Sequence, residues 1–239
     1  MHKDPEIIYE DNSMLAVAKP AGLVVHNDGR TNESALDEWV IARYPTITNV
    51  GGLHTLDSER YVPRAGVLHR LDRETSGVVL IAKDDETFYF LQRQFLDRTT
   101  EKKYNAYVVG VPTPPEGDIE LPIGRSRSDF RQWTTGEDAR GTLRPATTHY
   151  RTLETRGDFS FVELSPKTGR THQLRVHMKA LGYPILCDAR YGTPTGLGFA
   201  RLALHALSIN IKLPSGEQKT FIAPLPEDFL EAQKIFVKQ

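Results

Sequence analysis

The sequence predicts an α+β fold: a mixed, largely antiparallel β-sheet with flanking helices and a central cleft. Short apolar runs separated by turn residues, such as residues 7–9 and 14–19, indicate strands. Other segments, such as residues 171–181, carry apolar residues at helical spacing. A chain of 239 residues without internal repeats can bury a proper core. We therefore expect one folded domain or two modest subdomains.

Composition and charge narrow the class of protein. With 39% hydrophobic and 26% charged residues, the composition is typical of a folded soluble protein. The net charge of −1 argues against a protein that coats nucleic acid indiscriminately. A single cysteine agrees with a reducing compartment, and no apolar leader or membrane-spanning stretch is present. We expect a cytoplasmic chain that does not enter a membrane.

The first half of the chain alternates strands and helices. After strands at 7–9 and 14–19, a turn at 20–22 contains proline and glycine. A helix is expected over 34–42, with Ser34 as its N-cap. Residues 44–63 have little periodicity, which predicts a long loop.

After residue 82, a helix that Asp84 caps is expected, and its stripe of Phe88, Leu91 and Phe95 indicates core packing. Residues 124–141 have no clean period and are expected to form an arginine-rich loop with Trp133. The proline-rich connection near 111–118 is the candidate subdomain boundary. The remaining expected elements are strands at 101–110, 146–153 and 159–164, a helix at 171–181, a hairpin at 207–213 and 219–223, and a helix at 227–236.

The most informative stretch is HRLDRETSG at residues 69–77, which runs into the apolar residues 78–82. The apolar run reads as a buried strand, and Val67-Leu68 begin another apolar segment before the polar turn. Asp72 is therefore expected on a turn between two buried strands. Aspartate, threonine and serine are also common in purely structural turns, so the residue types alone leave both interpretations open.

A second polar stretch, PKTGRTHQLRVHM, covers residues 166–178. Arg170 stands at the entrance of the helix expected over 171–181, whose first N–H groups would be available to an anion. His172 and His177 are five residues apart, on different helix faces, and no HExxH or CxxC spacing occurs. We expect no metal site.

These stretches resemble the RluA-type pseudouridine synthases. HRLDRETSG matches the signature loop of that family, and KPAGLVVH at 19–26, KKYNA at 102–106 and GRTHQLRVHM at 169–178 are similar to further family blocks in the same order. Residues 184–188 and 201–206 are similar to the last blocks, although Cys187 stands where the family usually has glycine. The resemblance covers nearly the whole chain.

The resemblance implies roles for individual residues. It implies that Asp72 is catalytic, that Arg70 enters the RNA when the target base leaves its stack, and that Tyr104 lies against that base. It also implies that Arg170 pairs with Asp72 and helps to close the pocket. A guanidinium beside a carboxylate keeps it ionised, which suits a nucleophile or base. The resemblance places Lys19 near the active site, whereas strand periodicity alone favours a surface charge at a strand end.

Basic residues near these blocks are the expected RNA contacts. Besides Arg70 and Lys19, they are His69, Arg73, Lys103, Lys167 and Arg175. If they share one face, they form a basic groove on a nearly neutral body.

The implied reaction converts a uridine in ribosomal or transfer RNA to pseudouridine, with a weak preference for large-subunit ribosomal RNA. The reaction needs no cofactor, and no nucleotide cofactor is expected. We expect a monomer. Residues 1–239 should form one catalytic domain without an S4-type RNA-binding domain.

Two alternatives to this function stay open. One is a hydrolase of N-glycosidic bonds, which would need a second carboxylate, with Glu74 the only one nearby in sequence. The other is a non-catalytic RNA-binding module.

Overall fold

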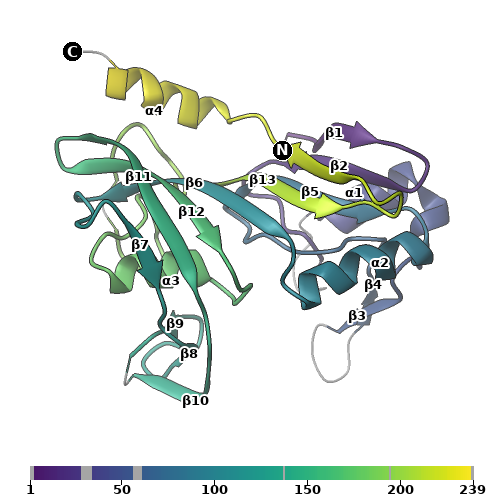
Figure 1. Ribbon diagram of the computed structural model, residues 1–239, viewed down its shortest axis with the longest axis horizontal. Helices are drawn as coiled ribbons and strands as arrows, with labels where there is room; N and C mark the ends of the chain where they lie inside the picture. The colour runs from purple at the N-terminus through teal and green to yellow at the C-terminus, as the bar shows by residue number, and fades with distance from the viewer. Residues whose placement is uncertain (1–2, 28–33, 56–60, 137, 194, 238–239) are drawn as a thin grey trace. The chain divides into compact units, whose positions relative to one another are not determined.

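The computed structural model describes residues 3–27, 34–55, 61–136, 138–193 and 195–237 (Figure 1). The chain forms two compact units: one contains Met1–Glu101 and Ala206–Pro224, and the other Lys102–His205 and Leu225–Gln239. The division does not fall at the candidate boundary near 111–118. That proline-rich segment connects two strands within the second unit, so its prolines mark a local turn.

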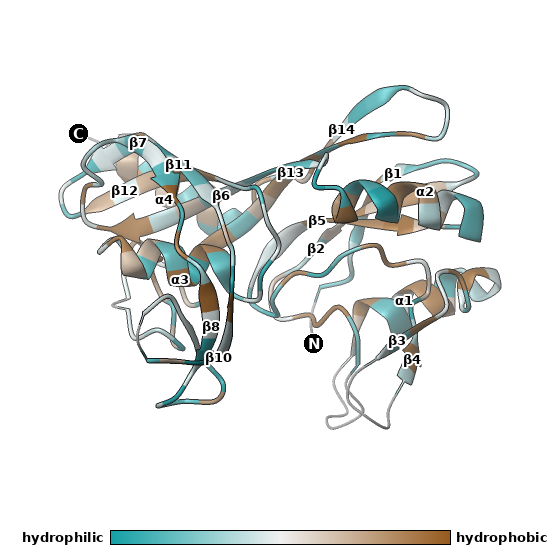
Figure 2. Cartoon of the chain, turned by 60° about the horizontal axis from the view of Figure 1, so that its bottom comes forward, coloured by the Kyte–Doolittle hydropathy of each residue, from teal (hydrophilic) through white to brown (hydrophobic). Residues whose placement is uncertain are grey.

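The first unit is built on a largely antiparallel sheet in the order β1-β2-β5-β13, with β14 paired to β13. Its strands are β1 (Glu6–Glu10), β2 (Met14–Lys19), β5 (Ser76–Ala82), β13 (Leu204–Lys212), which begins in the second unit, and β14 (Gln218–Ile222). All seven residues of β5 are buried, as predicted for its apolar run, which is mostly brown in Figure 2. The strands predicted at 7–9, 14–19, 78–82, 207–213 and 219–223 are therefore confirmed.

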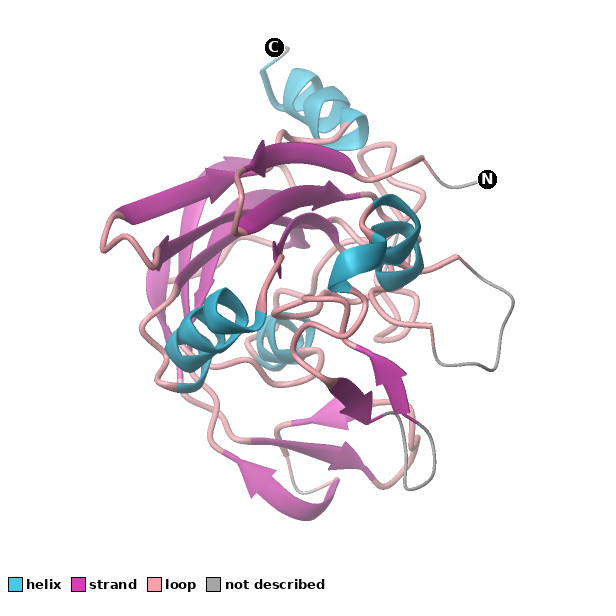
Figure 3. Cartoon of the chain, turned by 90° about the vertical axis from the view of Figure 1, so that its right-hand side faces the viewer, coloured by secondary structure: helices cyan, strands magenta, loops and turns pink. Residues whose placement is uncertain are grey.

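Two helices belong to the first unit (cyan in Figure 3). In α2 (Asp85–Leu96), the carboxylate of Asp84 accepts a hydrogen bond from the N–H of Thr87 at 2.7 Å, which confirms the predicted cap. The other helix, α1 (Leu36–Arg43), begins two residues later than predicted. Ala35 pairs with Val24 in a parallel bridge, so its backbone is extended, and Ser34 cannot serve as the cap.

The segment predicted as a long loop between residues 44 and 63 is more ordered than expected. It contains a 3₁₀ helix, η1 (Pro45–Ile47), and a short hairpin of β3 (Leu53–Thr55) and β4 (Tyr61–Pro63); residues 56–60 lie outside the described residues. The N–H of Gly51 donates to Asp85 at 2.8 Å, and a side chain at this position would overlap the ring of Phe88. These tertiary contacts to α2 order a segment that has no periodicity of its own.

The second unit carries an antiparallel sheet in the order β6-β12-β11-β7. Its strands are β6 (Glu101–Val109), β7 (Glu116–Ile119), β11 (Thr148–Arg156) and β12 (Phe159–Pro166), and its helices are α3 (Gln173–Ala180) and α4 (Glu227–Val237). The predicted strands and the C-terminal helix are confirmed. Throughout the described ranges, no helix is both long and apolar enough to cross a membrane.

The arginine-rich segment predicted as a loop forms a small separate sheet instead. Its strands are β8 (Ile123–Ser126), β9 (Trp133–Thr134) and β10 (Ala139–Arg144), in the order β10-β8-β9. Five of the six residues in β10 are exposed, so no alternation of apolar and polar residues marks the strand in the sequence. Backbone pairing with β8 holds it in place.

Tyr107 lies at the centre of the core of the second unit and is fully buried. Its ring is surrounded by those of Phe161, Phe199, Phe229 and Phe236, with centroids 4.8 to 5.5 Å away. The Tyr107 hydroxyl has no hydrogen-bond partner among the described residues, and burial raises the pKa of this phenol. A desolvated hydroxyl without a partner destabilises the fold.

Replacing Tyr107 with phenylalanine should therefore stabilise the protein. We expect Tyr107→Phe to raise the free energy of unfolding by about 1 kcal/mol and the melting temperature by roughly 2–4 °C. Urea denaturation and calorimetry measure the two quantities. Tyr150→Phe is the matched control, because the Tyr150 hydroxyl donates to the carbonyl of Pro114 at 3.0 Å and its loss should destabilise. A destabilised Tyr107→Phe chain would contradict the prediction.

Candidate functional site

Asp72 lies on a tight turn that leads into β5. The N–H of Thr75 donates to the carbonyl of Asp72 at 3.1 Å, which closes the turn. Before the turn, the N–H of Leu68 donates to the carbonyl of Leu80 at 3.0 Å, so the incoming segment runs beside β5. Asp72 thus sits between two paired segments, as the sequence predicted, although the first forms a single bridge and not a strand.

The ammonium group of Lys19 holds the turn in place. Lys19 is only 1% exposed. This group donates to the carbonyls of Pro20 at 2.8 Å, Leu23 at 2.7 Å and Arg73 at 3.1 Å. The N–H of Gly22 donates to the same Arg73 carbonyl at 2.9 Å. Burial differs from both sequence-based expectations for Lys19, a surface charge and an RNA contact. We assign it to the support of the turn.

Side chains on the turn differ in exposure. Arg70 and Arg73 are exposed, whereas Asp72 is half-buried. The exposed guanidinium groups of Arg70 and Arg73 favour the approach of a polyanion to this turn.

His69, predicted as an RNA contact, is half-buried and supports the backbone. Its Nε2 accepts a hydrogen bond from the N–H of Leu80 at 3.2 Å, which requires that nitrogen to be unprotonated. Its ring stacks on Phe95, with centroids 5.1 Å apart. Both contacts fix the start of the turn against β5 and α2.

A pair of stacked histidines lies in the same unit. The rings of His26 and His54 are 4.7 Å apart, and Nδ1 of His26 lies 3.0 Å from a carboxylate oxygen of Asp37. Burial, followed by the positive charges of His26, Arg64 and Arg70, lowers the pKa of His54 to about 4. Burial is the largest cause of this shift, and the nearby Asp37 carboxylate opposes it.

In the second unit, Tyr104 lies on β6, where it pairs with Leu164 of β12 and is half-buried. The neighbouring Lys103 is exposed, and its ammonium lies 3.3 Å from the carboxylate of Glu163. Alternation along β6 therefore places the two side chains on opposite faces, as in any strand. Lys103 is available at the surface, and Tyr104 is placed to present part of its ring.

Arg170 precedes α3, which begins two residues later than predicted. His172 adopts a left-handed conformation with φ of 55°, so the helix starts at Gln173. The side-chain oxygen of Gln173 accepts a hydrogen bond from the N–H of Arg170 at 3.0 Å. The availability of the first N–H groups of the helix to an anion stays a prediction. Nε of Arg170 donates to the carbonyl of Pro145 at 3.2 Å. Lys167, before it, is exposed.

Arg175, predicted as an RNA contact, is instead buried, with 9% of its surface exposed. It makes a bidentate pair with Asp188, at 2.7 and 2.8 Å, and its guanidinium lies 5.0 Å from the ring centroid of Tyr191. A buried charge requires such a partner. The structure therefore gives Arg175 a packing role.

Tyr191 was not singled out from the sequence, yet it connects several parts of this unit. Its hydroxyl accepts a hydrogen bond from the N–H of Trp133 at 3.1 Å and lies 2.9 Å from Nδ1 of His172. Its own N–H donates to Asp188 at 3.2 Å. The only signal in the sequence was the family-like block just before it, at residues 184–188.

The candidate residues are thus divided between the two units. Asp72 and Arg70 lie in the first unit with Lys19, His69 and Arg73, which the structure brings together around one turn. The second unit contains Tyr104, Lys103, Lys167, Arg170 and Arg175. The pairing of Arg170 with Asp72 stays a prediction.

Replacing Lys19 should loosen the turn that carries Asp72. Lys19→Met keeps the length of the side chain but removes the ammonium donor from the carbonyls of Pro20 and Leu23, while the Arg73 carbonyl keeps the N–H of Gly22. We expect a loss of about 2–3 kcal/mol in the free energy of unfolding. Urea denaturation measures this loss. The control is Lys234→Met, which removes an exposed pair with Glu231 and should cost less than about 1 kcal/mol. Equal losses in the two variants would contradict the assigned role.

The His54 pKa predicts how stability responds to acid. Unfolded His54 binds a proton near pH 6.5, whereas folded His54 does so near pH 4. Protonation therefore favours the unfolded chain, and stability present above pH 6.5 should be lost as the pH falls toward 4. His54→Gln should lose less stability over this interval than the wild type, as measured by urea unfolding at several pH values. Burial also lowers the pKa of His177, so His177 contributes to the pH dependence of stability in both the wild type and His54→Gln. Parallel plots of unfolding free energy against pH for the two proteins would refute the prediction.

Comparison with known proteins identifies related sequences. A family model described as RNA pseudouridylate synthase matches residues 13–180. An uncharacterized RNA pseudouridine synthase of Bacillus subtilis is 38% identical over 229 residues, which cover 95% of this chain and 71% of that protein. Ribosomal large subunit pseudouridine synthase D of Neisseria meningitidis is 37% identical over 236 residues, which cover 93% of this chain and 59% of that protein.

A solved structure is also similar. Human RNA pseudouridylate synthase domain containing 1 superposes with a TM-score of 0.73 and 28% sequence identity, covering 93% of this chain and 84% of the human chain. Together with the observed sheets and helices, this likeness confirms the predicted fold class.

Proposed function

Because this chain belongs to the RNA pseudouridylate synthase family, we propose that it isomerises a specific uridine of large-subunit ribosomal RNA, with Asp72 as the catalytic carboxylate. In this reaction the bond between N1 of uracil and C1′ of ribose breaks, the base rotates, and C5 bonds to C1′. The hydrogen on C5 leaves as a proton and N1 gains one, so the product is an isomer of the substrate. RNA pseudouridine synthases are therefore isomerases.

The observation that carries the proposal is the position of Asp72 on a turn fixed by the backbone bonds described above. Thr75 closes the turn, and Lys19 and Gly22 both bind the carbonyl of Arg73. A side chain that must act at one atom of a substrate needs such a rigid support. Asp72 itself is half-buried. It would act as nucleophile or base in breaking the glycosidic bond.

Arg70 would support the displaced base. A stacked uridine has to leave its helix before the glycosidic bond is accessible, at a cost of a few kcal/mol. Arg70 is exposed two residues before Asp72, so the same turn that carries the carboxylate also presents a guanidinium to the RNA. In the proposal, Arg70 occupies the space that the base leaves.

From the family resemblance, we propose Tyr104 and Arg170 as further residues of the site. The half-buried ring of Tyr104 would stack on the target base, which recovers about 1–3 kcal/mol of the cost of flipping. Arg170 would orient the Asp72 carboxylate through charge-assisted hydrogen bonds. Lys103, Lys167 and Arg73 are exposed and would bind phosphates.

The choice of large-subunit ribosomal RNA rests on the name of the Neisseria relative, and transfer RNA is the alternative substrate. We further propose that the chain acts as a monomer in the cytoplasm. We propose no cofactor, because the reaction oxidises nothing and consumes no phosphate.

The decisive test uses ribosomal transcripts with tritium at C5 of uridine, since forming the C5–C1′ bond expels this hydrogen. The wild type should release tritium, and Asp72→Asn should reduce the rate by at least about 100-fold while it keeps the fold and RNA affinity. Glu74→Gln is the matched control on the same turn and should stay active. Tritium release by Asp72→Asn at the wild-type rate would refute the catalytic assignment. Free uracil as a product, lost in Glu74→Gln, would favour the hydrolase instead.

A further inference from the structure

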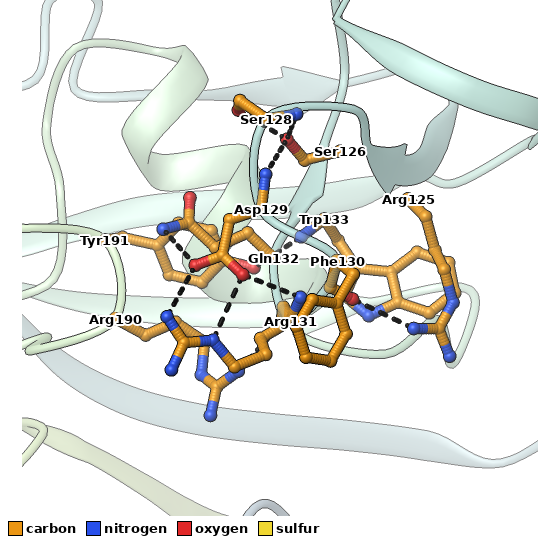
Figure 4. Close-up of polar contacts among 10 residues, drawn as sticks. All are labelled: Arg125, Ser126, Ser128, Asp129, Phe130, Arg131, Gln132, Trp133, Arg190 and Tyr191. Atoms are coloured by element: carbon orange, nitrogen blue, oxygen red, sulfur yellow. Dashed lines mark hydrogen bonds and ion pairs between the residues drawn. The ribbon is translucent and has the colours of Figure 1, made fainter.

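The small sheet of the second unit carries exposed arginine and aromatic side chains that the proposed reaction does not use. We call this surface the arginine–aromatic face and define it by Arg125, Phe130, Arg131, Trp133 and Arg190 (Figure 4). We infer that the arginine–aromatic face binds unpaired nucleotides of the RNA substrate, with Phe130 as a stacking platform. This inference rests on the proposed function, since it assumes that RNA is the substrate.

Phe130 is 64% exposed, although it lies on a well-fixed turn. Its carbonyl accepts a hydrogen bond from Nη1 of Arg125 at 2.9 Å. The N–H of Ser126 donates to the carbonyl of Gln132 at 3.0 Å, and the N–H of Gln132 donates to that of Asp129 at 2.9 Å. The fold therefore fixes the backbone that carries an uncovered phenyl ring. A preorganised aromatic ring loses little entropy when a ligand stacks on it.

Arginines lie over both aromatic rings of the face. The guanidinium of Arg125 is 5.1 Å from the ring centroid of Trp133, and that of Arg131 is 5.9 Å from the ring centroid of Phe130. Nη1 of Arg190 donates to the carbonyl of Arg131 at 2.7 Å. Each guanidinium has five N–H donors, so the groups that hold the turn still have donors for a phosphate. Stacked guanidinium and aromatic planes suit a nucleotide, which offers both a flat base and an anion.

The charge of the segment favours an anionic ligand. Residues 123–144 contain five arginines, no lysine and three carboxylates, within a chain of net charge −1. The carboxylate of Asp129 is held by Nε of Arg131 at 3.1 Å, and that of Asp138 accepts hydrogen bonds from the hydroxyls of Ser126 and Ser128. These two carboxylates serve the turn itself. Arginine, with its planar guanidinium, is the cation that stacks and binds phosphates bidentately.

Unpaired nucleotides fit this surface better than a duplex does. In double-stranded RNA the bases are stacked on one another, so their faces cannot reach Phe130. A loop or a strand beside the target uridine exposes those faces. The face is also joined to the candidate catalytic region of its unit, because the N–H of Trp133 and Nδ1 of His172 both contact the hydroxyl of Tyr191. RNA bound here is therefore held by a frame that includes the start of α3.

The experiment compares a labelled oligouridylate with a fully paired RNA duplex by fluorescence anisotropy at one fixed salt concentration. Phe130→Ala should weaken binding of the oligouridylate by about 5- to 100-fold, the range expected for loss of one stacked base. Binding of the duplex should change by less than about twofold, and Phe130→Trp should restore the single-strand affinity. Tyr89→Ala, which removes a 57% exposed aromatic from α2, is the matched control and should bind as the wild type does.

A second readout follows the face directly. The chain has two tryptophans, so in a Trp39→Phe background Trp133 is the only one. Its fluorescence should be quenched by the oligouridylate and not by the duplex. Equal weakening on both RNAs in Phe130→Ala, or unchanged binding, would overturn the inference. If Phe130→Ala differs from the wild type in oligomeric state but not in RNA affinity, this would also overturn the inference and would assign the arginine–aromatic face to a protein contact.

Tritium release separates this inference from the proposed function. If the wild type binds oligouridylate through Phe130 but releases no tritium from any RNA, the proposed function fails and the binding face stands. If Phe130→Ala releases tritium from ribosomal transcripts with the wild-type KM, the binding face fails and the proposed function stands.

Discussion

The first unit depends on one buried positive charge. Lys19 is removed from water at the end of β2, and an ammonium in that position must be surrounded by acceptors. Three backbone carbonyls supply them, one of which belongs to Arg73, 54 residues further along the chain. Together with the pairing of Lys19 with Gly77 between β2 and β5, this requirement holds the 19–23 turn against the turn that carries Asp72. The backbone that solvates the lysine thus also supports the proposed catalytic carboxylate.

The entry into β5 obeys a second constraint, which is steric. Gly77 has φ of 124°, and a Cβ there would lie 2.1 Å from the carbonyl oxygen of Ala206. Only glycine lets the chain turn from the Asp72 loop into a fully buried strand at this close approach. Polar support from Lys19 on one side and close packing at Gly77 on the other leave the turn little freedom, which is what a reaction at a single atom demands.

Arginines of the same charge perform different tasks according to their burial. Arg175 is buried against Asp188 and stabilises the packing of α3, whereas Arg70 is exposed and is proposed to enter the RNA. Arg125 and Arg131 hold a turn with some of their donors and keep their charge at the surface. Sequence spacing does not distinguish these cases, because the partner that decides burial lies elsewhere in the chain. A basic residue in a family-like block is therefore not by itself a nucleic-acid contact.

Elements whose causes are local could be predicted from the sequence alone. The apolar run of β5, the Asp84 cap with its Phe88 and Leu91 stripe, and the turn at Asp72 depend on neighbouring residues, and the structure contains each of them. The family-like blocks also indicated the reaction class. Tertiary structure alone decided the late start of α1, the small sheet over residues 123–144, and the burial of Lys19 and Arg175. The physical reason is that a bridge, a sheet partner or a counter-charge far along the chain overrides local preference, and the sequence does not show which distant groups will meet.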